Sequence, residues 1–242
     1  MTKILILSPF RNEEHSVPQY LAAIQKLRYP PELIDLYWLE NDSSDNTLTL
    51  LKEAQPKMPF NSTTLESMTF HGPVKKRKPG GYIKDIGYGE GRVRSWLIIW
   101  NEYFTPLIRK SSADYVLCWW ADAIPPRNVI KYYLEVYGSH PDAGWVGGKM
   151  YRRYPKHNKV LSPWPESLFD HEEIAPCKMT GHVWMMPREP VAQCKFYRKG
   201  RDMHMSLVLG MKRLGLQSYF TPKVFIHHIS NDGKVWFADA GS

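Results

Sequence analysis

Apolar residues follow two different spacings along the first sixty positions. Residues 3–8 (KILILS) and 34–39 (IDLYWL) are short apolar runs, which are typical of buried strands in a parallel sheet. Residues 16–27 instead place apolar side chains at helical spacing, and Pro30 follows at the point where that helix must end. A second helix is predicted over 46–54, after an acidic loop. Two strand–helix units in succession predict a parallel sheet with right-handed crossovers.

The rest of the chain continues this alternation less regularly. The pattern predicts strands at 64–70, 115–120, 144–150, 180–187 and 224–228, and helices at 92–108, 128–137 and 202–214. Gly215 is well placed to end the last of these helices. The stretch 60–91 differs, because its Lys, Gly and Pro residues predict a loop after the strand. The sequence holds no internal repeat and no low-complexity tract, so we expect a single α/β domain over residues 1–242.

Composition and cysteine usage narrow the class of protein. Of the 242 residues, 43% are hydrophobic, which is enough for a sizeable core. Cys118, Cys177 and Cys194 form no CxxC pair, which argues against a thiolate zinc site and against a disulfide scaffold. The first apolar run is too short for a signal peptide, and no segment has the roughly 18 consecutive apolar residues of a membrane span. We therefore expect a protein of the cytoplasm, or of the host cytoplasm if the source is viral.

The charge balance favours polyanionic partners. The formal net charge is +8 and the isoelectric point about 9.3. Nucleic acid, an anionic membrane face and phosphorylated substrates all fit this charge, and the run Lys75–Lys78 (KKRK) is a candidate contact for a phosphate backbone. Many basic proteins bind only small phosphates, however, and a run of four basic residues is more often an exposed loop. Charge alone speaks to association and solubility, so it leaves the chemistry open.

Chemically distinctive groups lie at or just after the ends of four of the predicted strands. These groups are Pro9–Glu13, Glu40–Asp42, Asp122 and the pair His227–His228. Ligands of open α/β sheets bind outside the carboxyl ends of the strands, so we expect the four groups to meet at one edge. Carboxylate and imidazole together suit a divalent cation that neutralises a diphosphate. A lone Asp at a strand end also serves as a turn residue or a helix cap, which is the alternative for Asp122.

Five segments of the chain carry a resemblance to a known family. They are SPFRNEEHSVPQYL, WLENDSSDNTLTLL, DYVLCWWADAIPPRNVI, TGHVWMMPRE and GRDMHMSLVLGMKRLGL followed by PKVFIHH. In this order they resemble the motifs of glycosyltransferase family 2 and its GT-A relatives, over nearly the whole chain. The resemblance implies a GT-A, Rossmann-like fold, with a mixed, mostly parallel central sheet flanked by helices. It also implies a nucleotide-sugar-binding half at 1–125 and an acceptor-binding half at 126–242.

The same resemblance implies roles for individual residues in binding the donor. Those matching base-, ribose- or diphosphate-binding positions are Pro9, Arg11, Glu13, Glu40, Asp42, Arg92, Arg94 and Ala121. Asp42 either assists binding or caps a turn, and the two Arg residues either grip the diphosphate or form a solvated helix face. Asp122 matches the second Asp of the Asp-x-Asp motif, which holds the metal in such enzymes. The implied cofactors are a divalent metal, Mn²⁺ or Mg²⁺, and a nucleotide-sugar donor, for which a UDP-sugar is our first expectation.

Two departures from the family pattern affect the metal and the catalytic base. The first Asp of Asp-x-Asp falls at Trp120, and the Glu of the late Glu-Asp pair falls at Arg201. Asp202 then matches the general base, although Asp at this place is also a common helix N-cap. A late metal-binding His matches His227 or His228. Because side chains alternate along a strand, only one of them can face the site, and we favour His228.

The resulting hypothesis is an inverting sugar transfer to an acceptor hydroxyl. For a small, basic protein the acceptor could be a hydroxylated base in DNA, as in bacteriophage DNA modification, or another polyanion. A polysaccharide, lipid or small-molecule acceptor is the alternative. A nucleotidyltransferase would normally need a Gly-rich phosphate loop after the first strand, and SPFRNEEH has none. A non-catalytic nucleic-acid-binding module on a degenerate transferase fold also stays open, because Trp120 replaces an Asp.

Overall fold

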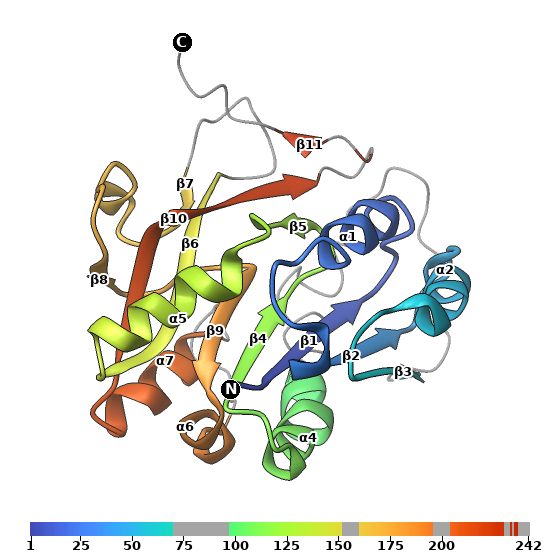
Figure 1. Cartoon of the computed structure of the whole chain (residues 1–242), viewed down its shortest axis with the longest axis horizontal. Helices are drawn as coiled ribbons and strands as arrows, with labels where there is room; N and C mark the ends of the chain where they lie inside the picture. The colour runs from blue at the N-terminus through green and yellow to red at the C-terminus, as the bar shows by residue number, and fades with distance from the viewer. Residues whose placement is uncertain (70–96, 152–159, 196–203, 230–232, 234, 237–242) are drawn as a thin grey trace, which may run out of the picture.

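One mixed sheet runs through the protein, and helices pack against both of its faces (Figure 1). The computed structural model describes residues 1–69, 97–151, 160–195, 204–229, 233 and 235–236. Within these residues the sheet has 11 strands. The mixed α/β architecture predicted from the sequence is confirmed.

The amino-terminal part alternates strands and helices, as its apolar spacing predicts. Its elements are β1 (Ile4–Phe10), α1 (Val17–Ile24), η1 (Pro31–Leu33), β2 (Ile34–Asn41), α2 (Thr47–Ala54), η2 (Gln55–Lys57) and β3 (Ser62–Met68). All seven residues of β1 except Pro9 are buried, which is the pattern expected of a central strand covered on both faces. Pro18 stands in the first turn of α1, where its missing N–H has no helical partner to lose.

The second part is less regular and contains several short strands. Its first elements are η3 (Ile99–Phe104), α4 (Thr105–Lys110), β4 (Tyr115–Trp119), β5 (Ala123–Ile124), α5 (Val129–Ser139), β6 (Ala143–Tyr151), β7 (Val160–Ser162) and η5 (Glu166–Leu168). These are followed by β8 (Ala175–Cys177), β9 (Val183–Pro187), α6 (Arg188–Gln193), α7 (His204–Arg213), β10 (Gln217–Ile229) and β11 (Val235–Trp236). Among the described residues, no helix is both long and apolar enough to cross a membrane.

Strand order and direction bring several strand ends to one edge. The order is β11-β10-β6-β9-β4-β1-β2-β3. Strands β3, β2, β1 and β4 are parallel, β9 is antiparallel to both β4 and β6, and β6 is parallel to β10. The carboxyl ends of β1, β2, β4 and β10 therefore lie at the same edge, and in Figure 1 the arrowheads of β1, β4 and β10 end on the same side. Because β9 runs the other way, its amino end lies there too.

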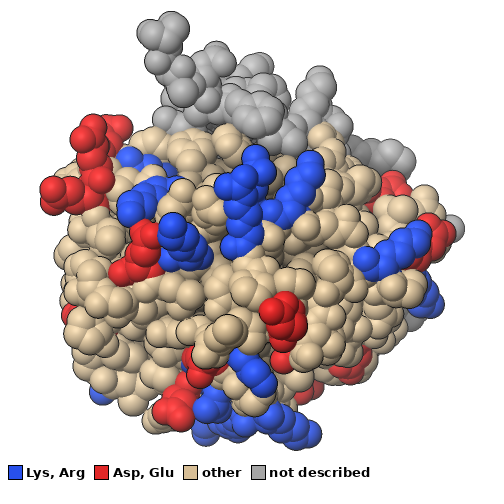
Figure 2. All heavy atoms as spheres, in the orientation of Figure 1, with Lys and Arg blue, Asp and Glu red and all other residues tan. Residues whose placement is uncertain are grey.

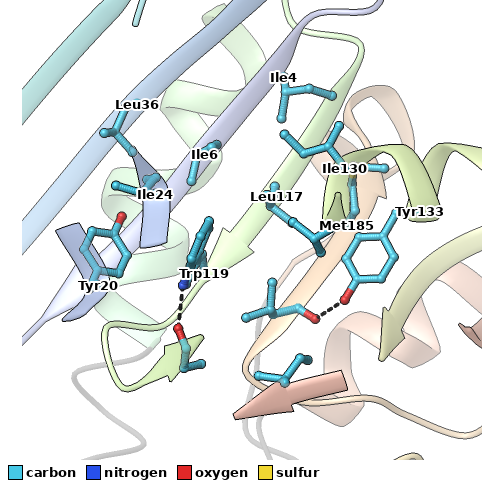
Figure 3. Close-up of a cluster of buried hydrophobic side chains, with 14 of the residues drawn as sticks. Ile4, Ile6, Tyr20, Ile24, Leu36, Leu117, Trp119, Ile130, Tyr133 and Met185 are labelled. Carbon is cyan, nitrogen blue, oxygen red and sulfur yellow. Dashed lines mark hydrogen bonds between the residues drawn. The ribbon is translucent and has the colours of Figure 1, made fainter. Parts of the chain in front are cut away.

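Two apolar layers, one on each face of the sheet, hold the elements together. On one face, Trp119 of β4 packs edge-on against Tyr20 of α1, with the ring centroids 5.5 Å apart (Figure 3). On the other face, the indoles of Trp100, Trp184 and Trp145 stack in succession with centroids 5.5 and 4.2 Å apart. These side chains are almost fully buried, so the main use of these tryptophans is to fill the core.

The structure corrects the sequence-based boundaries at two places near the carboxyl edge. The strand predicted over 180–187 begins only at Val183, because His182 has a φ of 63° that a strand cannot contain. The helix predicted over 92–108 is described from 97 onward, and its stretch Ile99–Phe104 is π-helical. Strands of two or three residues, such as β5, are too short to show a hydrophobic period, and the sequence did not predict them.

Candidate functional site

Two loops at the carboxyl edge, after β1 and after β2, are bound tightly to each other. The Asn12 backbone N–H donates to Ser43 Oγ at 3.0 Å, and the Ser44 N–H donates to Asn12 Oδ1 at 2.8 Å. The Asn46 N–H donates to Glu14 Oε2 at 3.0 Å. Asn12 also has a φ of 54°, in the left-handed region that Asn tolerates better than most residues. The acidic and amide residues of both loops thus build one rigid rim.

Glu40 and Asn41, at the end of β2, differ in whether their side-chain polar atoms have hydrogen-bond partners within the protein. Glu40 is buried, and its carboxylate accepts the Ser43 N–H at 2.8 Å and the Ser67 hydroxyl at 2.6 Å. Both of its oxygens therefore have partners inside the protein. Asn41 is also buried, at 3% exposure, but its Nδ2 has no hydrogen-bond partner among the described residues. The sequence analysis included Asn41 in the group Glu40–Asp42 but gave it no role of its own, and its Nδ2 is the buried donor that a ligand could satisfy.

The other predicted nucleotide-binding residues of this rim have varied surroundings. Glu13 accepts the Ser16 hydroxyl at 2.7 Å, and so helps to hold the start of α1. Pro9 is half-buried in β1, opposite Leu39 of β2. Arg11 is exposed, and Asp42 has a φ of 50° at the start of its loop. Ala121 is buried in the core, directly before Asp122 in the chain.

A carboxylate and two imidazoles meet at the middle of the same edge. Asp122 Oδ2 lies 3.3 Å from His228 Nε2, and Asp122 Oδ1 lies 3.7 Å from His182 Nδ1. Potential ligand atoms of all three residues lie within 4.8 Å of one another. Asp122 and His228 are buried and His182 is nearly so, with side-chain exposures of 8, 8 and 16%. One divalent cation could bridge these three groups, because carboxylate oxygen and neutral imidazole are both metal ligands.

The core directly beneath these residues fixes the loops that carry them. The Trp119 indole donates to the Ala123 carbonyl at 2.7 Å and so closes the turn that presents Asp122 (Figure 3). The Ile229 N–H donates to the Asp122 carbonyl at 2.8 Å, which joins the end of β10 to that turn. Each buried donor would be costly to leave unpaired, so these bonds favour one loop conformation.

The side chains of His227 and His228 point to opposite faces of β10, because side chains alternate along a strand. In the antiparallel pairing of β10 with β5, His228 is opposite Ala123 and His227 is opposite Ile124. The His228 imidazole faces Asp122, whereas the His227 ring packs 5.1 Å from Phe225. Sequence reasoning missed His182, because it placed this residue inside the strand predicted over 180–187 and looked for site residues where strands end. His182 comes before a strand, and it reaches this edge because β9 is antiparallel to β4.

Three predicted residues lie outside the described part of the chain. These are Arg92 and Arg94, assigned to the diphosphate, and Asp202, assigned as the general base. The basic run Lys75–Lys78 lies outside it as well. Their predicted roles stay predictions.

Comparison with known proteins finds similarity at two levels. The Anp1 family profile matches residues 1–78, which span β1 to β3 and the two joined loops. The mannan polymerase II complex anp1 subunit of Schizosaccharomyces pombe is 43% identical over 51 residues. That alignment covers 21% of this chain and 12% of the yeast protein.

Solved structures extend the similarity to the whole fold. A mannosyltransferase from Pyrobaculum calidifontis, in complex with GDP-Man and Mn²⁺, superposes with a TM-score of 0.63 at 15% identity. It covers 96% of this chain, which spans 58% of that protein. Glucosyl-3-phosphoglycerate synthase from Mycobacterium tuberculosis, in complex with Mn²⁺, UDP and glucosyl-3-phosphoglycerate, superposes with a TM-score of 0.54 at 17% identity. The superposition covers 94% of this chain and 72% of the synthase chain. The fold is therefore that of the GT-A glycosyltransferases.

Proposed function

We propose that this chain transfers a sugar from a nucleoside-diphosphate donor to a carbohydrate hydroxyl, with a divalent cation bound at Asp122 and His228. The observation that carries the proposal is the meeting of these two side chains, 106 positions apart, at the carboxyl edge of a GT-A sheet. The cation would supply a positive charge for the diphosphate as it leaves. Its site lies beside the joined loops, at the edge where α/β sheets bind nucleotides.

Residues of the donor half, 1–125, would hold the nucleotide. The joined loops after β1 and β2 form its rim, and Arg11 is exposed there to reach a phosphate. Asn41 Nδ2 is a buried donor suited to a carbonyl oxygen of the base, and satisfying it would favour binding. Glu40 would act through the loop that it holds, because both of its carboxylate oxygens are engaged within the protein.

The acceptor half, 126–242, would supply the base. Asp202 would accept the proton of the acceptor hydroxyl while that oxygen attacks the anomeric carbon. The bond from the anomeric carbon to the donor phosphate oxygen breaks, and the nucleoside diphosphate leaves with the electron pair. This single displacement inverts the anomeric configuration, as the resemblance to glycosyltransferase family 2 implies.

A carbohydrate acceptor is favoured over DNA. The Anp1 profile and a yeast relative named for mannan both match the amino-terminal part of the chain. The small size of the chain and its net charge of +8 suggest DNA as one possible acceptor, and no match supports it. Figure 2 shows several Lys and Arg side chains close together in the upper part of the face in view, with Asp and Glu side chains around them, so the preference for a carbohydrate rests on the two matches and not on surface charge. Nearly half of the Lys and Arg residues lie outside the described part of the chain.

A donor screen tests the proposal directly. Thermal unfolding of the full chain is measured with Mn²⁺ and each of GDP-mannose, UDP-glucose and UDP-N-acetylglucosamine. The donor that stabilises the chain most is then tested for sugar transfer to mannan oligosaccharides and to DNA that carries hydroxymethylated bases. A true donor at 100 times its dissociation constant should stabilise the fold by about 2.7 kcal/mol. Asp122→Ala should abolish the metal-dependent part of this stabilisation, and Asp202→Asn should keep donor binding but lose transfer.

The matched control is His227→Ala, which removes the neighbouring imidazole that faces away from Asp122. It should leave the metal-dependent stabilisation intact. If no nucleoside diphosphate or its sugar stabilises the chain with Mn²⁺ present, the proposal is wrong. If the chain transfers sugar to DNA and not to the oligosaccharides, the proposed carbohydrate acceptor is wrong, but the proposed sugar-transferase activity is supported.

A further inference from the structure

His182 contacts the candidate metal site from a third part of the chain. Its Nδ1 lies 3.7 Å from Asp122 Oδ1, whereas His228 lies close to the other oxygen, Oδ2. The two imidazole rings are nearly perpendicular, with centroids 4.8 Å apart. The carboxylate therefore has one imidazole beside each of its oxygens, and the three groups surround a common point.

The backbone at His182 is held in an unusual conformation. Its φ of 63° lies in the left-handed region, which only a few per cent of residues other than Gly adopt, His being among the types found there more often. The buried Tyr133 hydroxyl donates to the carbonyl oxygen of the next residue, Val183, at 2.8 Å (Figure 3). On the preceding side, Thr180 Oγ1 accepts the Trp145 indole N–H at 2.7 Å. Such over-determined, left-handed residues cluster at functional sites, and here the conformation turns the imidazole toward Asp122.

Trp120 holds the His182 ring in place. The Trp120 indole stacks on the imidazole with centroids 4.7 Å apart and an angle of 13° between the planes. The Trp120 backbone N–H also donates to the His182 carbonyl at 3.0 Å. The resemblance to glycosyltransferase family 2 places a carboxylate at position 120, where it would face the metal. In this chain the residue at 120 instead supports an imidazole.

We propose that His182 is the third protein ligand of the cation, positioned by Trp120, so that the centre is a 2-His-1-carboxylate site selecting transition metals over Mg²⁺. The inference rests on the proposed function, since it concerns the cation of the same site. Mg²⁺ favours oxygen ligands, whereas imidazole favours Co²⁺, Zn²⁺ and their neighbours. With one carboxylate and two imidazoles, affinity should rise from Mn²⁺ to Co²⁺ and should be lowest for Mg²⁺.

Metal titration of the full chain without donor or acceptor tests this inference. The protein is freed of metal by a chelator and titrated calorimetrically with Mg²⁺, Mn²⁺ and Co²⁺, and the visible spectrum of the Co²⁺ form reports its ligands. We expect Mg²⁺ to bind more than about tenfold more weakly than Co²⁺. His182→Asn should weaken Co²⁺ binding more than about tenfold and change the spectrum. Asn is the chosen substitute because it tolerates a positive φ.

Matched variants separate ligation from folding. His227→Asn should bind Co²⁺ as the parent does, because its ring faces away from Asp122. Trp120→Phe, which keeps an aromatic ring for stacking, should retain more of the affinity than Trp120→Ala. His182→Asp replaces an imidazole by a carboxylate and should shift the preference toward Mg²⁺, which provides a second readout if His182→Asn fails to fold.

Two results would overturn the inference. One is unchanged Co²⁺ affinity and spectrum in folded His182→Asn, and the other is Mg²⁺ binding by the parent as tight as Co²⁺ binding. Either could occur in a chain that still transfers sugar, in which case the proposed function survives. Conversely, a parent that binds Co²⁺ through His182 but binds no nucleotide sugar contradicts the proposed function and leaves the metal site standing.

Discussion

At the scale of single residues, buried aromatic side chains both fill the core and hold the loops of the site. Trp119 and Tyr133 are fully buried, yet each directs one polar atom at a backbone carbonyl beside a candidate metal ligand. Trp119 holds the turn of Asp122, and Tyr133 holds the start of β9 beside His182. A large aromatic residue with one polar atom can do both, because its body is apolar and its donor must find a partner. The position of the site is thus set from within the core.

Asn41 allows a prediction in which stability and binding change in opposite directions. Its buried Nδ2 has no partner among the described residues, and such a group costs roughly 1–3 kcal/mol. Asn41→Leu keeps the branched shape, although its methyl groups are larger, and it removes this cost, so denaturant unfolding should show a gain of about 1 kcal/mol. The same variant should bind the nucleoside diphosphate about five- to tenfold more weakly, since one hydrogen bond contributes about 1 kcal/mol. Metal affinity is the control and should not change. A variant that loses stability and keeps nucleotide affinity would remove Asn41 from the proposed site.

The residues of the site differed in how far the sequence could identify them. Asp122 and His228 follow or end strands, so the rule that ligands bind at carboxyl ends could find them. His182 precedes a strand, and only the antiparallel direction of β9 brings it to that edge. Strand direction depends on the pairing of distant segments, which no local pattern records. The pair Gly181-His182 at the start of the predicted strand was the available signal, and it is weak without the topology.

At the scale of elements, the end of α7 shows how one glycine sets a boundary. Gly215 has a φ of 77°, and its N–H donates to the Lys212 carbonyl at 3.0 Å. The Leu216 N–H donates to the Met211 carbonyl at 3.0 Å, which completes a Schellman cap. The role predicted for Gly215 as the helix stop is confirmed. The left-handed conformation, and not packing, requires glycine here, because a Cβ would meet nothing within 4 Å.

A pair of glycine variants tests that explanation. Gly215→Ala should lower the free energy of unfolding by roughly 1–2 kcal/mol, the cost of a left-handed L-residue. Gly138→Ala, inside α5, also has open space around the new Cβ, but its backbone is helical. This control should instead raise the free energy of unfolding by up to about 1 kcal/mol. Denaturant titration measures both, and two variants of equal stability would refute a conformational origin.

Elements with a long hydrophobic period were predicted well, and short ones were not. The runs that became β1, β2 and β6 are apolar over most of their length, so their burial could be predicted without knowing the fold. Strands β5 and β8 have two and three residues and exist only because β10 offers an edge to pair with. β5 is nevertheless important for the site, since its pairing with β10 brings His228 to Asp122. The decisive contact therefore depends on the least predictable kind of element.

At the scale of the whole molecule, the buried thiols predict how stability depends on pH. Burial raises the pKa of the Cys177 thiol to about 12 and that of Cys194 to about 11, and it raises the pKa of Cys118 as well. A raised pKa means that the folded protein keeps these thiols neutral, while the unfolded chain ionises them above about pH 8.5. The unfolded state then binds fewer protons than the folded state, so stability must fall as pH rises through this range.

The stability contributed by neutral thiols should accordingly be complete below about pH 8 and decline between about pH 9 and 11. For Cys177 the loss amounts to roughly 1.4 kcal/mol for one pH unit above its unfolded pKa. Cys177→Ala removes one thiol at the strand β8, where it pairs with Ser218 of β10. It should lower stability at pH 7 through lost packing, but flatten the decline between pH 8 and 10 relative to the parent. Denaturant unfolding at several pH values measures this, and an identical alkaline slope in the two proteins would show that other groups, such as the buried tyrosines, control it.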